Sequence, residues 1–149
     1  MDSKHSIEES LARLISLNES LAEALAEERA GLAAQDLTEI AKAAEAKAAA
    51  CGAIETITAE LGPVPLSEQI VTLATARQAP AAELLSTLRE IAADNRQSNI
   101  TNGKILHRSQ HVVRELIGLL SGVGPDTQLL YAASGQTQAT ASSGAIAEA

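Results

Sequence analysis

The sequence has no phenylalanine, no tryptophan and a single tyrosine, Tyr131. Its hydrophobic fraction of 46% therefore consists almost entirely of alanine, leucine, isoleucine and valine. Strands favour aromatic and β-branched residues, whereas alanine, leucine, glutamate, lysine and arginine lose little conformational freedom in a helix. The composition predicts an all-α protein with slender, closely packed helices.

Several other classes of protein are disfavoured by what is missing. The single cysteine, Cys51, cannot form an internal disulfide and lies in an alanine-rich stretch, so we expect it to act as a small hydrophobic side chain. There is no secretory signal pattern and no apolar run long enough to span a bilayer, so we expect a cytoplasmic protein without membrane insertion. A net charge of -8 argues against binding to nucleic acids or anionic membranes.

No group of residues fits a catalytic or metal site. His107 and His111 are four residues apart on a predicted helix, but the glutamate of a zinc-protease helix is missing. Two histidines also fall short of the three or four ligands that zinc takes. The glycine and lysine that normally surround a phosphoacceptor histidine are not placed around His107 or His111. We therefore expect no enzymatic activity, no cofactor and no metal.

The first predicted helix begins near Ile7, where apolar residues start to recur at alternating steps of four and three. This seam consists of Ile7, Leu11, Leu14, Asn18, Leu21, Leu25, Glu28 and Leu32. The pattern breaks between Gly31 and Asp36. Asp36 followed by Glu39 is typical of a capped helix start, so we expect a kink or tight turn there.

A second helix with a weaker seam is expected next. Its members are Leu37, Ile40, Ala44, Lys47, Cys51, Ile54, Thr58 and Leu61. Because alanine buries little area, this helix needs partners on both sides to be stable. Gly62-Pro63 ends it, a short helix is expected over residues 66–78, and Pro80 marks the next boundary.

The third long helix is predicted from Ala81 to about Ser121. Its seam contains Leu84, Leu88, Ile91, Asn95, Ser98, Asn102, Ile105, Ser109, Val112, Leu116, Leu119 and Val123. Asn102-Gly103 is also compatible with a turn, although no alternating strand pattern flanks it. Within a helix Gly103 costs about 1 kcal/mol relative to alanine, which we attribute to a close approach of another helix.

Polar residues interrupt the seams of the first and the last of the long helices. We interpret Asn18, Asn95, Asn99 and Asn102 as a buried polar layer that fixes the register of the helices. On that interpretation, replacing Asn102 by leucine stabilises the protein. The alternative is that these amides form a groove that binds the backbone of a partner.

Together these patterns predict an elongated antiparallel helical bundle with coiled-coil-like seams, made of three long helices and one short helix over residues 1–123. After Val123 the composition changes to serine, threonine, glutamine, glycine and alanine, which predicts a disordered, flexible tail over residues 124–149. Within it Leu129, Leu130 and Tyr131 form an apolar cluster. This cluster is either a short interaction motif or a cap on the open end of the bundle.

The chain resembles the FlgN family of flagellar type III export chaperones. The likeness is carried by Glu27-Glu28-Arg29-Ala30-Gly31-Leu32, by Asp36-Leu37 with Lys47 downstream, by the stretch from Asn95 to Gly103, and by Tyr131-Ala132-Ala133-Ser134-Gly135. Each segment is degenerate alone. Their order and spacing from Ile7 to about Gly135 make the combined match specific.

The resemblance implies a cytoplasmic chaperone that binds hook-filament junction (hook-associated) proteins, prevents their premature assembly and delivers them to the flagellar export gate. It also implies that the carboxyl-terminal part binds the cargo and that Tyr131 contacts an export gate component. The expected partner-binding residues are Val112, Val113, Leu116, Ile117, Leu120, Leu129, Leu130 and Tyr131. The alternative function is a self-associating coiled-coil scaffold or adaptor, and the seams are also compatible with a homodimer.

Overall fold

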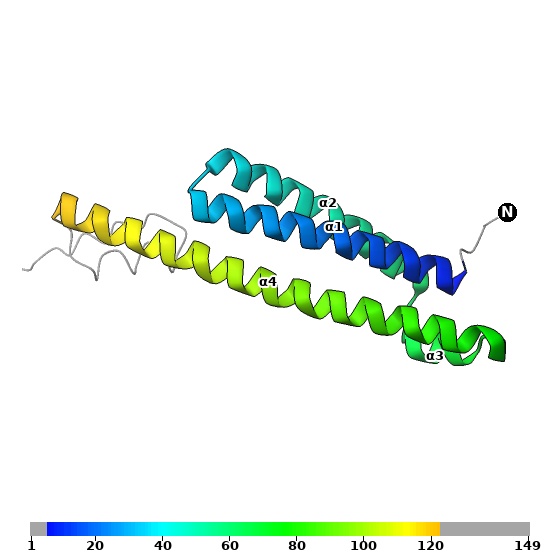
Figure 1. Ribbon diagram of the computed structural model, residues 1–149. Coiled ribbons are helices and arrows are strands. Elements are labelled where there is room, and N and C mark those ends of the chain that lie inside the picture. Colours follow the sequence, from blue (N-terminus) through cyan, green and yellow to red (C-terminus); the bar gives the residue numbers. More distant parts are fainter. Residues whose placement is uncertain (1–5, 123–149) are drawn as a thin grey trace, which may run out of the picture. The chain divides into compact units, whose positions relative to one another are not determined.

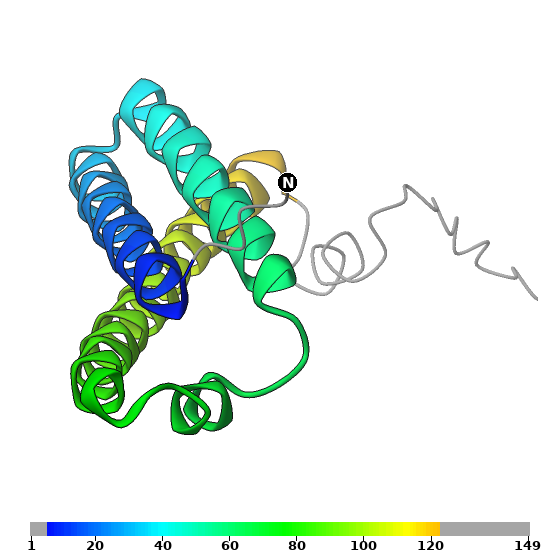
Figure 2. The ribbon, with the colours of Figure 1, turned by 90° about the vertical axis from the view of Figure 1, so that its right-hand side faces the viewer.

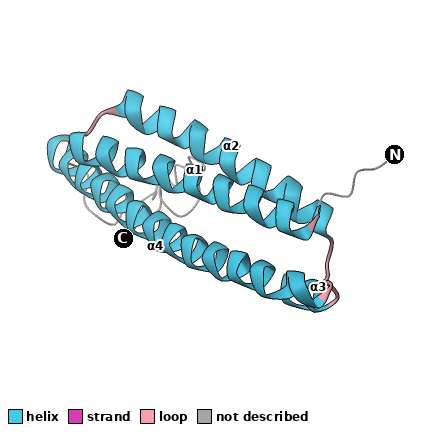
Figure 3. Ribbon diagram, turned by 45° about the vertical axis from the view of Figure 1, so that its right-hand side comes forward, coloured by secondary structure: helices cyan, strands magenta, loops and turns pink. Residues whose placement is uncertain are grey.

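A computed structural model describes residues 6–122, and all regular secondary structure in this range is helical (Figures 1 and 3). The helices are α1 (Ile7–Ala34), α2 (Leu37–Leu61), α3 (Leu66–Val71) and α4 (Thr75–Ser121). The predicted all-α fold with three long helices and one short helix is therefore confirmed. The predicted tail, residues 124–149, lies outside the described residues. Within residues 6–122 no helix is long and apolar enough to cross a membrane.

The chain divides into two units, Met1–Leu106 and His107–Ala149, and each is described by itself. In the first unit α1 lies beside α2 on one flank and beside the first part of α4 on the other (Figure 2). Successive long helices run in opposite directions, so α1 and α4 are parallel.

Side-chain caps define the starts of α1 and α2, and a left-handed residue ends α1. The Ser6 hydroxyl accepts a hydrogen bond from the Glu9 amide at 3.2 Å, and the Glu9 carboxylate accepts one from the Ser6 amide at 3.0 Å. At the other end Gln35 adopts a left-handed conformation (φ 55°), and the Asp36 carboxylate then accepts from the amides of Thr38 and Glu39. The break predicted between Gly31 and Asp36 is thus a tight turn between two helices.

Small side chains allow α1 and α2 to pack closely. The fully buried residues of α2 are Ala43, Ala50 and Ile57, spaced by one heptad. On α1, Gly31 lies directly against α2, since a Cβ atom placed there would be 3.1 Å from both the backbone nitrogen and the Cγ1 atom of Ile40. A glycine at this crossing permits the turn to bring the two helices together.

The predicted seam of α2 is wrong in its phase. Ala43, Ala50 and Ile57 are buried against α1, whereas the expected members Ala44 and Thr58 are exposed and Leu37 is 80% exposed. The error arises because alanine occupies both neighbouring stripes of this helix, so the pattern of hydrophobic residues does not distinguish them. The other predicted members, Ile40, Lys47, Cys51, Ile54 and Leu61, are half-buried.

An aliphatic cluster holds the amino-terminal part of α1 against α3 and α4. Its buried residues are Leu11, Ile70, Ala81 and Leu85, with Ile7, Leu66, Leu73, Leu84 and Leu88 packed around them. The short helix ends at Val71 rather than at Gln78, and α4 already begins at Thr75. The boundary predicted at Pro80 is therefore wrong. Pro80 lies just beyond the first turn of α4, where the loss of one backbone donor is tolerated because the packed cluster holds the helix.

The predicted seams of α1 and of α4 up to Leu106 are confirmed by burial. Each seam residue in this unit is buried or half-buried, from Ile7 to Leu32 and from Leu84 to Ile105. The helix also continues through Asn102 and Gly103, so no turn forms there. No atom lies within 4 Å of a Cβ atom built on Gly103, so the expected close approach of another helix is wrong.

Two glycine substitutions test the packing of α1 against α2. Gly31→Ala should lower the free energy of unfolding by about 1 kcal/mol, because overpacking against the Ile40 backbone outweighs the gain in helix propensity. Gly52→Ala is the matched control, since no atom lies within 4 Å of its added Cβ, and it should raise the same quantity by about 0.5–1 kcal/mol. Urea unfolding followed by circular dichroism measures both. Equal gains in both variants would show that α1 and α2 are less closely packed here.

Candidate functional site

Buried asparagines connect α1 to α4 at two levels. The Asn95 side-chain amide donates to the Asn18 carbonyl oxygen at 2.7 Å, and the Asn102 amide donates to the Leu25 carbonyl oxygen at 2.9 Å. The same contact therefore recurs one heptad later, with the same sequence offset of 77 residues. This repeat aligns the two parallel helices. The Asn18 amide in turn donates to the Leu14 carbonyl oxygen within α1.

At the second level a polar network joins all three long helices. Asn102 also donates to Glu28 Oε2 at 2.9 Å, and its own oxygen accepts from Arg29 Nε at 3.0 Å. The other oxygen of the Glu28 carboxylate accepts from Lys47 Nζ on α2 at 2.8 Å. Within residues 6–122 no buried side-chain nitrogen or oxygen lacks a hydrogen-bond partner. The network is thus fully paired, as a buried polar group requires.

Opposing effects act on the Glu28 carboxyl group. Its burial raises its pKa, whereas the hydrogen bonds from Lys47 and Asn102 and the charge of Lys47 lower it. The net effect is a pKa below the ordinary value, so Lys47 and Asn102 together outweigh desolvation. The side chains of Glu28 and Lys47 are 12% and 29% exposed, which shields the pair from much of the solvent screening.

Asn99 does not belong to the buried layer, and its predicted burial is wrong. The residue is exposed, and its side-chain oxygen accepts a hydrogen bond from Lys47 Nζ at 3.3 Å. Asn99 directly follows the seam residue Ser98, and it lies on the flank of α4 that faces Lys47 of α2. The other three asparagines are 2–6% exposed, and their amides donate hydrogen bonds within the chain. This favours the interpretation that they set the register of the helices, rather than the alternative that they bind the backbone of a partner.

The pairing of Glu28 with Lys47 was not predicted, although both residues stood in the proposed seams. Two opposite charges that interrupt neighbouring apolar seams are a signal for such a pair. Each residue was predicted only as a member of its own seam, so the contact that the pair makes between α1 and α2 was not predicted.

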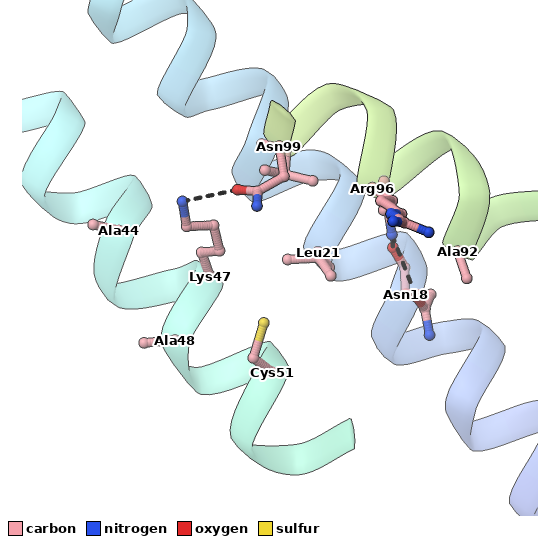
Figure 4. Close-up of a pocket in the computed structure, with 11 residues that line it drawn as sticks. Asn18, Leu21, Ala44, Lys47, Ala48, Cys51, Ala92, Arg96 and Asn99 are labelled. Atoms are coloured by element: carbon pink, nitrogen blue, oxygen red, sulfur yellow. Dashed lines mark hydrogen bonds between the residues drawn. The ribbon is translucent and has the colours of Figure 1, made fainter. Parts of the chain in front are cut away.

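Beside this network lies a groove between α2 and α4, with a volume of about 430 Å³ (Figure 4). We call it the α2–α4 groove. Its lining comprises Asn18, Leu21 and Leu25 from α1, Ala44, Lys47, Ala48 and Cys51 from α2, and Ala92, Asn95, Arg96 and Asn99 from α4. Figure 4 shows the Lys47 and Asn99 side chains meeting across it and the Cys51 sulfur pointing into it. A concave, largely apolar surface with a few polar groups is suited to binding.

The second unit presents a different surface. Six aliphatic residues of its helix are exposed, at fractions between 55% and 82%: Val112, Val113, Leu116, Ile117, Leu119 and Leu120. At about 100° per residue they cover an arc of about 160° on one side of the helix. We call this surface the aliphatic arc. It brings together five of the predicted partner-binding residues and adds Leu119, whereas Leu129, Leu130 and Tyr131 lie outside the described residues.

The histidines of the second unit do not form part of a cluster of metal ligands. The Nε2 atom of His111 lies 3.3 Å from the Glu115 carboxylate, one helical turn away. Among residues 6–122 no group of three or more histidine, cysteine, aspartate or glutamate side chains is placed to hold a metal ion.

The protein family described as FlgN protein matches residues 1–139 of the chain. No curated protein and no solved structure matches the sequence.

Replacing Asn102 by leucine tests the polar network. The variant should lose about 1–2 kcal/mol of unfolding free energy, because the loss of hydrogen bonds to Glu28 and Arg29 outweighs the added apolar burial. The sign is opposite to the stabilisation expected from the sequence, because Asn102 is paired with two charged side chains and so contributes stability in addition to register. Gln97→Leu, on the exposed side of the same helix, is the control and should change stability by less than about 0.5 kcal/mol. A more stable Asn102→Leu variant would mean that the network only sets the register.

The lowered pKa of Glu28 predicts how stability depends on pH. The stabilisation by the charged carboxylate is fully present above the ordinary pKa of 4.5 and is lost as the pH falls through the lower pKa of the folded state. Urea unfolding from pH 7 to pH 3 should show this loss, and Glu28→Gln should reduce it. The remaining pH dependence includes Glu8, whose pKa is lowered by its hydrogen bonds to Arg77. Glu27→Gln controls for the loss of one negative charge, and an identical pH profile in the two variants would contradict the assignment.

Proposed function

The chain belongs to the FlgN family, a family of flagellar export chaperones and not of enzymes, and from that premise we propose that it binds hook-filament junction proteins in the cytoplasm. Binding would keep these clients from assembling before export and deliver them to the export gate. The observation that carries the proposal is the aliphatic arc, which leaves six large apolar side chains exposed on one helix.

The arc has the properties of a surface that binds an amphipathic helix. Contiguous exposed apolar side chains on one helical face mark interaction sites in soluble proteins. An amphipathic helix binds such a face through residues spaced by three and four positions. Val112, Leu116 and Leu119 follow this spacing, and Val113, Ile117 and Leu120 repeat it one position along. The arc therefore offers two parallel ridges to a client helix.

Leu129, Leu130 and Tyr131 complete the proposal. They contribute a second apolar cluster for the client, and Tyr131 contacts the export gate component. The support for these roles is the family membership and the position of the cluster within the matched residues 1–139.

A double substitution in the arc tests client binding. Val113→Glu with Leu116→Glu should weaken binding of a purified hook-filament junction protein at least about tenfold, since the exposed side chains would lose their apolar contacts. The helical circular dichroism should not change, because both residues are more than half exposed. His111→Glu, on the side of the same helix opposite the arc, is the matched control and should retain affinity. Isothermal titration calorimetry gives the dissociation constants, and unchanged binding by the double variant would remove the arc from the mechanism.

The same arc also favours a second candidate function, a self-associating scaffold, because it is compatible with pairing between two copies. In that case the melting temperature of the unmodified chain rises with protein concentration, and the double substitution abolishes this dependence. For the proposed chaperone without its client, the melting temperature is independent of concentration. Calorimetric scans over a hundredfold range of concentration separate the two functions.

A further inference from the structure

The α2–α4 groove remains without a role in the proposed function. Three sides of it are formed by α1, α2 and α4, of which α1 provides the floor through Leu21 and Leu25. In a four-helix bundle each helix packs against two neighbours around a common core. Here α1 packs against both α2 and α4. The groove lies where a fourth helix, across the core from α1, would pack.

The walls of the groove are made of small residues. Ala44 and Ala48 on α2 and Ala92 on α4 are all exposed although they line a concave surface. Helices pack with their axes about 8–10 Å apart, and the shorter distances need small side chains at the contact. The groove therefore has the shape that admits the ridge of another helix.

The heptad pattern of α2 points to the same occupant. The sequence carries a seam through Leu37, Ala44, Cys51 and Thr58, and this stripe does not face α1, since Ala43, Ala50 and Ile57 are the residues buried there. Cys51, at the centre of the stripe, is half-buried and lines the groove. Thus α2 has two adjacent seams, one filled by α1 and one that borders the groove. The second seam keeps the coiled-coil spacing that a helical partner requires.

The charges of the groove define the chemistry of the partner. Lys47 and Arg96 are the charged residues in its lining, and both are cations, although the chain has 19 acidic and 11 basic residues. Lys47 is paired with Glu28. Arg96 is exposed and has no ion pair within residues 6–122. An occupant with a carboxylate beside its apolar stripe would pair with this guanidinium.

We propose that the α2–α4 groove binds an amphipathic helix of a partner protein, with alanine and leucine along its buried stripe and a carboxylate that pairs with Arg96. The helix packs on Leu21 and Leu25 between the alanine walls and completes a four-helix arrangement. The proposal concerns the first unit alone and is independent of the role assigned to the aliphatic arc.

Cys51 provides a specific readout because it is the only cysteine of the chain. The probe is a synthetic helical peptide of about three heptads, with alanine and leucine at the a and d positions and glutamates beside them. Its counterpart carries lysines in place of the glutamates. With the full chain and the acidic peptide at ten times its dissociation constant, alkylation of Cys51 by iodoacetamide should slow about tenfold. The lysine peptide should protect Cys51 far less.

A charge reversal tests the role of Arg96. Arg96→Glu should weaken the acidic peptide about fivefold to tenfold and strengthen the lysine peptide. Arg89→Glu makes the same change of charge on α4 at a residue that does not line the groove, and it should leave both affinities unchanged. Ala48→Trp, which fills the groove at an exposed position, should remove the protection while helical circular dichroism is retained.

Four outcomes would overturn the proposal. The first is an alkylation rate that the acidic peptide does not change, and the second is an equal effect of Arg89→Glu and Arg96→Glu. The third is faster alkylation of the peptide-free chain after removal of residues 123–149, which would assign the groove to the chain itself. The fourth is an alkylation rate that depends on protein concentration without peptide, which would assign it to a second copy. None of these results bears on client binding by the aliphatic arc, which is measured with the double variant.

Discussion

The alignment of the helices in the first unit depends on one polar network. In it, Asn102 on α4 donates hydrogen bonds to the Leu25 carbonyl oxygen and to the Glu28 carboxylate on α1, and that carboxylate pairs with Lys47 on α2. Aliphatic contacts are non-directional, so leucine and alanine seams alone permit helices to slide by a heptad. Asn102 can reach Glu28 and the Leu25 carbonyl in one register only. The aliphatic cluster around Leu11 supplies apolar burial at the amino-terminal part of α1, and the polar network farther along α1 determines how the helices are aligned.

Much of this fold could be predicted from the sequence because α1 and α4 carry leucine and isoleucine on one stripe and polar residues elsewhere. The helix start at Asp36 was also predictable, since a side-chain cap is a local feature. The phase of α2 was not, because a helix with alanine on adjacent stripes carries no periodic contrast. The start of α4 at Thr75 was also missed, because tertiary packing against α3 overrides the local preference of Pro80.

The aliphatic arc could be predicted from the sequence, whereas the α2–α4 groove could not. The aliphatic arc is recognisable because large apolar side chains on one face of a helix must be covered by something. The α2–α4 groove is a property of three helices together, and it arises from alanines whose small size matters only where neighbouring elements leave space. Asn99 lies four residues after the buried Asn95 and three residues before the buried Asn102, yet it is exposed at the rim of the groove.

The alanine-rich face of α2 has a consequence for the motions of the molecule. Each alanine contributes roughly one methyl group to the contact with α1, and two of the three buried residues of α2 are alanines. It is also bounded on both sides by turns, at Gln35 and at Gly62-Pro63. Because small side chains dominate its buried stripe, we expect the amide protons of α2 to exchange with solvent sooner than those of α1.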